Sequence, residues 1–381
     1  MIDFTLTPEH EELQSLYRKF AEERIKPIAR EMDEKEEYSL ELVAEMQELG
    51  FFGIPFPAEY GGADGDVLSY VLCMEEVSKV DGSTGITLSV HTSLCASSIY
   101  EFGTEEQKRK FLTPLIDGSK VGCYGLTEPD AGSDAGGART IAVKDGNEYV
   151  ITGNKIFTTN SGFADIFLVF ALTDKEAGTR GMSAFVVEKG TPGLSVSANI
   201  PRMGIRAASN CEVVYDEVRV PEANLIGGEG KGFKVAMKAL DGGRIGIAAQ
   251  ATGIAQGAIN EAVKYVKERV QFGKPISAFQ NTQFKLAEMQ TMVDAARLMT
   301  YRAAVEKDKG GNYGAYAAMA KLFASEVAND VTRGCVQLFG GYGYAREYHV
   351  ERMMRDAKIT EIYEGTSEVM KMVISASMGV K

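Results

Sequence analysis

One carboxylate in this sequence is a clear candidate for acid–base chemistry. Glu364 lies in the segment KITEIYEGTSEVM, between an aromatic residue and a glycine. Thr366 or Ser367 can cap the helix that follows, and Glu368 then falls in the first turn, where the helix dipole favours an acid. Because Glu364 precedes the cap, its side chain is free to point into whatever the kink faces.

Histidine and cysteine, which often serve in catalytic and metal sites, are scarce in this chain. The chain has three histidines and five cysteines among 381 residues, and no two cysteines form a CxxC pair. A zinc site, a disulfide framework, a histidine-based metal centre and a Ser-His-Asp triad therefore have few candidates. We expect no metal, and acid–base chemistry must rest on a carboxylate, a tyrosine, a lysine or a cofactor.

Two glycine-rich segments fail as nucleotide-binding motifs. GGEGKG ends in Lys231-Gly232 without the Ser or Thr of a P-loop, and Leu225 occupies the place of its first glycine. GGYGYA has Arg346 at the third glycine position of a dinucleotide fingerprint and no strand before it. Neither a P-loop nucleotidase nor a Rossmann dehydrogenase is supported.

The segment YGLTEPDAGSDAGG, from Tyr124 to Gly137, is a better candidate for a ligand-binding loop. It offers the hydroxyls of Thr127 and Ser133, and its glycines let backbone N–H groups approach a ligand closely. An ordinary polar loop between two domains is the alternative, which composition leaves open.

The elements that position these residues change type twice along the chain. Thr7-Pro8 predicts a helix start, Ser39 and Thr104 predict two further caps, and 66–80 and 83–101 carry helical patterns. From Val121 onward, short β-branched and aromatic runs separated by turns, one at Asp145-Gly146, predict an antiparallel sheet. Long Ala-, Met- and Leu-rich segments then predict four helices, at 231–268, 280–309, 314–340 and 366–378.

The predicted fold class is therefore α+β with several domains. We expect an N-terminal all-α domain at 1–118, a middle antiparallel β domain at 119–230 and a C-terminal four-helix bundle at 231–381.

The charge and hydropathy of the chain exclude some classes of binding partner. The formal net charge of −12 argues against nucleic acid or an anionic membrane as the main partner. No run approaches the ~18 apolar residues of a membrane span. The first twenty residues are acidic and amphipathic without a targeting pattern, so we expect a cytoplasmic protein of bacterial type.

Four segments resemble signatures of the acyl-CoA dehydrogenase family. They are the loop from Tyr124 with Gly132-Ser133-Asp134, the helix junction QLFGGYGYAREYHVERMMRD, the segment EIYEGTSE and the loop RVQFGKPISAFQ. They occur in the family's order over essentially the whole chain. The segments LDGGRIGIAAQ and VDGSTGITLSVHTSLCA are similar to the corresponding segments of short-chain, butyryl-type members.

This resemblance implies FAD, bound in the crevice between the sheet and the bundle. The residues implied for the flavin and its pyrophosphate are Tyr124, Leu126, Thr127, Gly132 and Ser133, and those for the isoalloxazine ring are Phe157, Thr158 and Thr159. The residues implied for the adenine end are Arg269, Phe272, Gln280, Gln337, Gly340 and Gly341, with Thr366 and Glu368 near the adenosine and pyrophosphate. The family often has tryptophan at Phe157, so the ring is kept and the indole N–H is lost.

The resemblance also implies α,β-dehydrogenation of an acyl-CoA thioester, with Glu364 as the base. In the family the backbone N–H of this residue, together with a flavin hydroxyl, holds the thioester oxygen. The second family position for a base is Gly243 here, which favours Glu364. Residues implied to contact the substrate are Ser133, Asp241, Arg244, Tyr363 and Gly365, a surface charge being the alternative for Arg244.

The implied partners are an acyl-CoA, an electron-transferring flavoprotein and further copies of the chain in a homotetramer, a dimer of dimers. Butyryl-CoA oxidation to crotonyl-CoA is the first expectation, and the sequence leaves its direction open. Two alternatives remain: an oxygen-using flavoenzyme of the acyl-CoA oxidase or nitroalkane oxidase kind, and a non-catalytic helical scaffold.

Overall fold

The computed structural model describes residues 5–380, and its N-terminal part is helical. The predicted starts are confirmed: the Thr7 side chain accepts from the N–H of His10 and Pro8 is the first helical residue, and Ser39 caps a later helix. The helices are α1 (Pro8–Phe20), α2 (Lys26–Lys35), α3 (Leu40–Glu48), α4 (Val67–Ser78), α5 (Gly82–Ser89), α6 (Ser97–Phe102), α7 (Glu105–Gln107) and α8 (Thr113–Ile116).

The segment predicted as one helix over 83–101 is interrupted. Between α5 and α6 the backbone forms a π-helical segment, Val90–Ala96, whose residues are all buried. Such segments shift the side chains that follow them around the helix and occur often at functional sites. The predicted capping box of Thr104 and Gln107 is confirmed.

The middle of the chain forms an 8-stranded sheet in the order β6-β7-β3-β2-β4-β5-β8, with β1 beside β4. Its strands are β1 (Gly122–Gly125), β2 (Ile141–Asp145), β3 (Glu148–Thr159), β4 (Ile166–Leu172), β5 (Met182–Glu188), β6 (Leu194–Val196), β7 (Asn210–Pro221) and β8 (Leu225–Ile226). The prediction of an antiparallel sheet is confirmed for most pairs, and Asp145 pairs with Glu148 across the predicted turn. It is wrong for two pairs, because β1 lies parallel to β4 and β2 meets β4 in parallel at Ile141 and Leu172. The four residues of β1 are too few to show an alternating pattern in the sequence.

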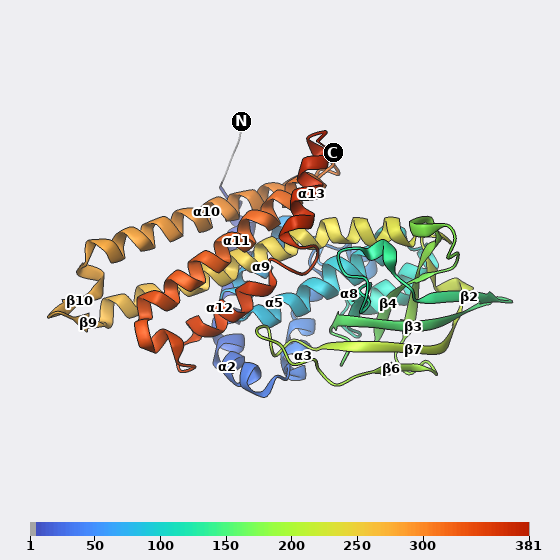
Figure 1. Cartoon of the computed structure of the whole chain (residues 1–381), viewed down its shortest axis with the longest axis horizontal. Helices are drawn as coiled ribbons and strands as arrows, with labels where there is room; N and C mark the ends of the chain where they lie inside the picture. The colour runs from blue at the N-terminus through green and yellow to red at the C-terminus, as the bar shows by residue number, and fades with distance from the viewer. Residues whose placement is uncertain (1–4, 381) are drawn as a thin grey trace.

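Helices return after β8. They are α9 (Gly232–Glu268), α10 (Gln280–Asp308), α11 (Gly314–Phe339), α12 (His349–Ile359) and α13 (Ser367–Ser377), with the short strands β9 (Val270–Gln271) and β10 (Lys274–Pro275) between α9 and α10. The four predicted helices are present, and α12 is an additional one. Figure 1 shows the sheet at one end of the molecule and the β9–β10 hairpin at the opposite end of the long helices.

Glycines on α9 allow other elements to approach it closely. A Cβ atom on Gly253 would lie 2.4 Å from the carbonyl oxygen of Glu75, and one on Gly257 would lie 2.0 Å from that of Lys79. Any larger residue at either position would push α4 and the chain after it away from α9. The N-terminal helices and the bundle therefore share one core, which also contains Val71, Leu72 and Ile254.

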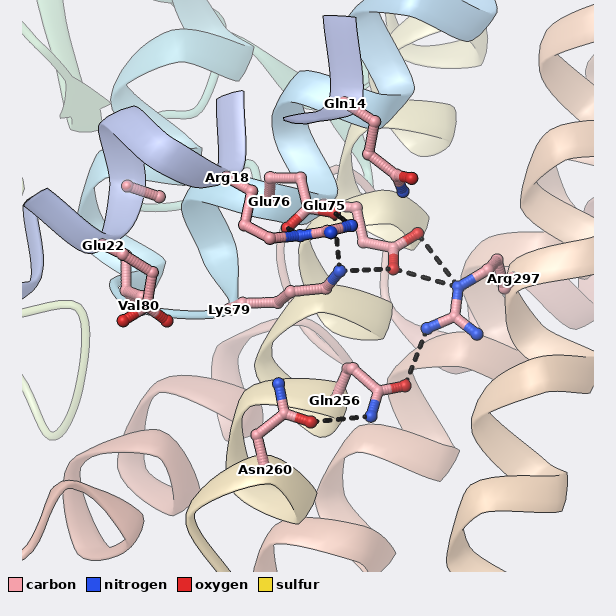
Figure 2. Close-up of a pocket in the computed structure, with 11 residues that line it drawn as sticks. Gln14, Arg18, Glu22, Glu75, Glu76, Lys79, Val80, Gln256, Asn260 and Arg297 are labelled. Atoms are coloured by element: carbon pink, nitrogen blue, oxygen red, sulfur yellow. Dashed lines mark hydrogen bonds and ion pairs between the residues drawn. The ribbon is translucent and has the colours of Figure 1, made fainter. Parts of the chain in front are cut away.

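A buried charge network joins the same two regions (Figure 2). The carboxylate of Glu75 is almost fully buried and accepts from Nε of Arg297 at 3.0 Å and from the hydroxyl of Tyr301 at 3.2 Å. Lys79 adds a contact to Glu75 at 3.4 Å. Burial alone would raise the pKa of Glu75, but Lys79 and Arg297 hold it below its usual value. These charged side chains line a surface cavity and are paired with one another. We therefore interpret the network as a contact that joins α4 to the bundle, and not as a ligand-binding site.

No described helix is long and apolar enough to cross a lipid bilayer.

Replacing Arg297 with Met should destabilise the protein markedly. Glu75 would stay buried and lose its guanidinium partner, which costs about 3 kcal/mol for a buried pair. The measurement is the midpoint of thermal unfolding. The matched control is Arg333→Met, because Arg333 pairs with Asp330 on the exposed surface of α11 and such pairs contribute less than about 1 kcal/mol. Equal midpoints for the two variants would contradict this account of the junction.

Candidate active site

The segment between α12 and α13 holds Glu364 in a sharp backbone kink. Glu364 has φ of 53° and Gly365 has φ of 98°, both in the left-handed region. Thr366 then caps α13, its side chain accepting from the N–H of Val369 at 3.3 Å, and Glu368 falls in the first turn as predicted. A non-glycine residue in this conformation is uncommon, so the kink places Glu364 at a cost in backbone energy.

The carboxylate of Glu364 faces α9. Both of its oxygens are buried, and neither has a hydrogen-bond partner in the described part of the chain, although the residue as a whole keeps some exposure. The nearest surroundings include Gly243: a Cβ atom there would lie 2.0 Å from Oε2 of Glu364 and 2.8 Å from Cδ2 of Leu94. The space for the carboxylate thus exists because position 243 has no side chain.

Two cations on the bundle helices act on this carboxylate. Burial raises the pKa of Glu364 to about 8, and the charges of Lys321 and Arg244 oppose that rise. A base with a pKa near the operating pH is the most effective one for proton abstraction. The surroundings therefore tune Glu364 in the direction that the sequence-based hypothesis requires.

Arg244 and Asp241 lie beside Glu364 on α9. Arg244 is 5% exposed, so the alternative of a surface charge is wrong. Its Nη1 donates to Asp241 at 2.6 Å, and its Nε donates to the backbone carbonyl of Glu364 at 3.5 Å. Burial raises the pKa of Asp241 despite this pairing. The pair forms one polar wall of the site.

Tyr363 connects the kink to two other helices. Its hydroxyl donates to the side chain of Gln250 on α9, and Gln250 donates to the carbonyl of Gly82 on α5 at 2.7 Å. The tyrosine thus helps to fix the position of the neighbouring Glu364.

The predicted ligand-binding loop leaves the end of β1 and runs from buried to exposed residues. Tyr124 and Leu126 are buried, whereas Gly132 and Ser133 are exposed. The loop is held by a fully buried ion pair that sequence reasoning missed: Nζ of Lys155 donates to Glu128 at 2.6 Å. Glu128 also accepts from the N–H groups of Arg139 and Thr140, so it links the start of the loop to the residues that enter β2.

Phe157 to Thr159 form a bulge near the end of β3. The register with β7 shifts between Lys155 and Thr158, and Phe157 has φ of 55° and is 56% exposed. The hydroxyl of Thr158 is buried and has no hydrogen-bond partner among the residues that the structure describes. The side-chain amide of Asn210 donates to both the Phe157 carbonyl and the Thr159 hydroxyl. The exposed ring of Phe157 lies beside the Thr158 hydroxyl, which has its hydrogen bond to give. A flat, polar ring system of a ligand could stack on the first and accept from the second.

The residues predicted for the adenine end lie at the opposite end of the bundle. Arg269, Gln337, Gly340 and Gly341 line one groove, whereas Phe272 and Gln280 lie outside its lining, the former 94% exposed. At 1.5 Å per helical residue, Arg269 lies about 40 Å along α9 from the Gly243 level. Within one chain, the two sets of predicted flavin residues are therefore too far apart to contact one cofactor.

In the described residues, no three His, Cys, Asp or Glu side chains gather closely enough to hold a metal ion.

Comparison with known proteins points to one family over nearly the whole chain. The family descriptions "Acyl-CoA dehydrogenase, N-terminal domain", "middle domain" and "C-terminal domain" match residues 7–119, 123–218 and 230–379. A short-chain specific acyl-CoA dehydrogenase of Clostridium acetobutylicum is 57% identical over 377 residues, covering 99% of this chain and all of that protein.

Two solved structures are similar along their whole length. Butyryl-CoA dehydrogenase from Megasphaera elsdenii is 51% identical with a TM-score of 0.97, covering 99% of this chain and 100% of that one. A chain from work on the electron transferring flavoprotein of Acidaminococcus fermentans and flavin-based electron bifurcation is 52% identical, with a TM-score of 0.98 and 99% of each chain covered.

Replacing Gly243 with Ala should displace the Glu364 carboxylate. The new methyl group would occupy the space that Oε2 now fills, and loss of a positioned base slows turnover of an acyl-CoA thioester by about 10²–10⁴-fold. The matched control is Gly242→Ala, whose Cβ would approach only the flexible end of Lys307, at 2.9 Å. Steady-state kinetics and bound-flavin absorbance are measured together. Unchanged turnover in the Gly243 variant would contradict the assigned geometry.

Proposed function

The chain belongs to the acyl-CoA dehydrogenase family, and from this premise we propose that Glu364 is the base that removes the α-proton of a short-chain acyl-CoA. The single observation that carries the proposal is the buried Glu364 carboxylate, which has a raised pKa and no hydrogen-bond partner among residues 5–380. A carboxylate with both oxygens free can approach a C–H group without first breaking a hydrogen bond.

The enzyme depends on FAD, like its family. Bound FAD supplies the acceptor for the hydride that leaves the β-carbon. In this proposal the exposed Phe157 ring and the unpaired Thr158 hydroxyl lie against the flavin ring, and the loop from Tyr124 to Ser133 holds the pyrophosphate side. The buried pair of Lys155 and Glu128 keeps that loop in place.

The backbone of Glu364 has a role besides that of its side chain. No described carbonyl accepts a hydrogen bond from its N–H group. This donor is therefore available for the thioester oxygen, on which negative charge develops as the α-proton leaves. Arg244 binds the carbonyl of the same residue and is a positioning group for the kink.

Butyryl-CoA is the proposed substrate, oxidised to crotonyl-CoA or formed by the reverse reduction. Support comes from the two relatives, named as short-chain specific and butyryl-CoA dehydrogenases. A Cβ atom on Gly246 would lie 2.6 Å from the Ser89 hydroxyl and 2.7 Å from that of Tyr70, so both side chains pack against α9 beyond Gly243. In this proposal they limit the length of the acyl chain.

We further propose an electron-transferring flavoprotein as the electron partner. The support is the similar chain from the work on the Acidaminococcus fermentans flavoprotein. The exposed ring of Phe157 offers an apolar contact beside the proposed flavin position.

We propose on geometric grounds that two copies of the chain pair, and the family resemblance extends this pair to a homotetramer, a dimer of dimers. Glu364 and the groove that contains Arg269 lie too far apart within one chain to share a cofactor, whereas a two-fold axis can bring the groove of a second copy to the first copy's Glu364. Each site would then combine residues of two chains.

Replacing Glu364 with Gln tests the central proposal. The variant should keep bound FAD and lose flavin reduction by butyryl-CoA by about 10²–10⁴-fold, because an amide does not accept the α-proton. Anaerobic stopped-flow absorbance measures the reduction in the wild type and the variant. Reduction at the wild-type rate in the variant would refute the assignment, and steady peroxide formation in air by the wild type would favour an oxidase.

Mixed oligomers test whether two chains build each site. Glu364→Gln chains and Arg269→Ala chains should each turn over poorly alone. Oligomers refolded from a mixture should regain activity, because some sites combine an intact Glu364 from one chain with an intact Arg269 from another. If activity does not exceed that of the separate variants while both bind each other, the sites lie within single chains.

A further inference from the structure

A second charged group beside the kink has no role in the function proposed above. Lys321 lies on α11 and is 0% exposed. Lysine is almost never fully buried unless its ammonium group is paired. The one hydrogen bond found for its Nζ goes to the backbone carbonyl of Gly365, at 2.7 Å.

This contact is the second hydrogen bond that holds the kink. Arg244 donates from α9 to the carbonyl of Glu364, and Lys321 donates from α11 to the next carbonyl, that of Gly365. The two carbonyls belong to the two residues with positive φ. The strained turn is thus held between two helices by two cationic donors.

The ammonium group is also electrostatically coupled to the carboxylate. Burial lowers the pKa of Lys321 to about 8, and the charge of Glu364 is the strongest influence opposing that fall. On the side of Glu364, the charge of Lys321 is the larger of the two that oppose the rise in pKa. A neutral lysine at this depth could donate a hydrogen bond, but only an ammonium ion favours the carboxylate form of Glu364.

The other groups around this pair come from several elements. Arg244 and Asp241 face it from α9, Tyr70 from α4 and Tyr124 from β1. The segment from α12 to α13 contributes Glu361, Tyr363 and Glu368. Glu361 and Glu368 raise the pKa of Lys321, while Arg244 lowers it. Lys321 and Arg244 are the two cations that raise the carboxylate population of Glu364. Arg244 is bonded to Asp241, whereas no carboxylate in the described part of the chain is bonded to Lys321.

We propose that Lys321 is a positioning residue for the base. Its ammonium group fixes the Gly365 carbonyl of the kink and supplies the buried positive charge that keeps Glu364 ionised for proton abstraction. The inference rests on the proposed role of Glu364 and adds a second residue to the control of that base.

The test compares three replacements of Lys321 in the FAD-containing enzyme. Met removes the donor and the charge, Gln keeps a donor without the charge, and Arg keeps both. The measurement is the rate of flavin reduction by butyryl-CoA at low substrate from about pH 6 to about pH 10, which reports the ionisation of the base in the free enzyme. FAD content and thermal midpoint are recorded for every variant.

In the wild type, reduction should fall as the pH decreases through the raised pKa of Glu364, because the protonated carboxyl cannot accept the α-proton. In Lys321→Gln and Lys321→Met this fall should move to higher pH by at least about one unit, because loss of a nearby positive charge disfavours the carboxylate. Lys321→Arg should keep the wild-type profile. If Lys321→Met fails to fold, Lys321→Gln decides the result.

A second measurement needs no electron transfer. Acetoacetyl-CoA has an acidic proton between two carbonyls, so the pH at which its bound enolate appears in the absorbance spectrum reports the same base. The matched control is Lys371→Met, because Lys371 is an exposed residue on α13 and its loss should move neither profile.

The inference is overturned if Lys321→Gln lowers the rate equally at every pH and leaves both profiles in place, since that result describes a purely structural lysine. Failure of the proposed function looks different. In that case the wild type itself is not reduced by butyryl-CoA, or Glu364→Gln is reduced as fast as the wild type.

Discussion

The site depends on one constraint: a carboxylate must stay buried without a hydrogen-bond partner. Isolated burial of a charge is so costly that the group normally becomes neutral instead. Here the cost is partly offset by two cations, Lys321 on α11 and Arg244 on α9, which come from different helices. The bundle must therefore bring both helices against one kink, and the long α9 and α11 pack directly on each other along the molecule (Figure 1).

Close approach to α9 is the second requirement, and glycine provides it at each contact. Gly243 leaves room for the Glu364 carboxylate, whereas Gly253 and Gly257 let backbone carbonyls of the N-terminal region approach. The same helix therefore positions Glu364, the N-terminal helices and, at its far end, the groove at Arg269. A change in the packing of α9 would affect all three. The charge network at Glu75 lies where α4 meets the bundle and helps to keep that packing fixed.

Much of this arrangement could be predicted from the sequence. Thr7, Ser39 and Thr366 cap helices as expected because a cap is a local interaction within four residues. The order of helices, strands and helices followed from local periodicity, and the family resemblance, with its dependence on FAD, is confirmed by matches along the chain.

What could not be predicted involves residues that are distant in sequence. Nothing local to Lys321 or Lys155 indicates that their ammonium groups are buried, because burial depends on partners at Gly365 and Glu128. Gly243 showed only that no base lies there, and its steric role appears once Glu364 is placed against it. Lys321 and Gly243 act on Glu364, whereas Lys155 holds the loop that follows β1.

The way Glu364 is held also explains how a fixed carboxylate remains a strong base. A carboxylate held by hydrogen bonds to its own oxygens is stabilised as an anion, so its pKa falls and it becomes a weaker base. In this kink the donors bind the carbonyls of Glu364 and Gly365, and both carboxylate oxygens stay free. The backbone fixes the position of the side chain, at a cost of about 1–3 kcal/mol for a left-handed non-glycine residue. Position and basicity are thus controlled separately, and a raised pKa does not require a mobile side chain.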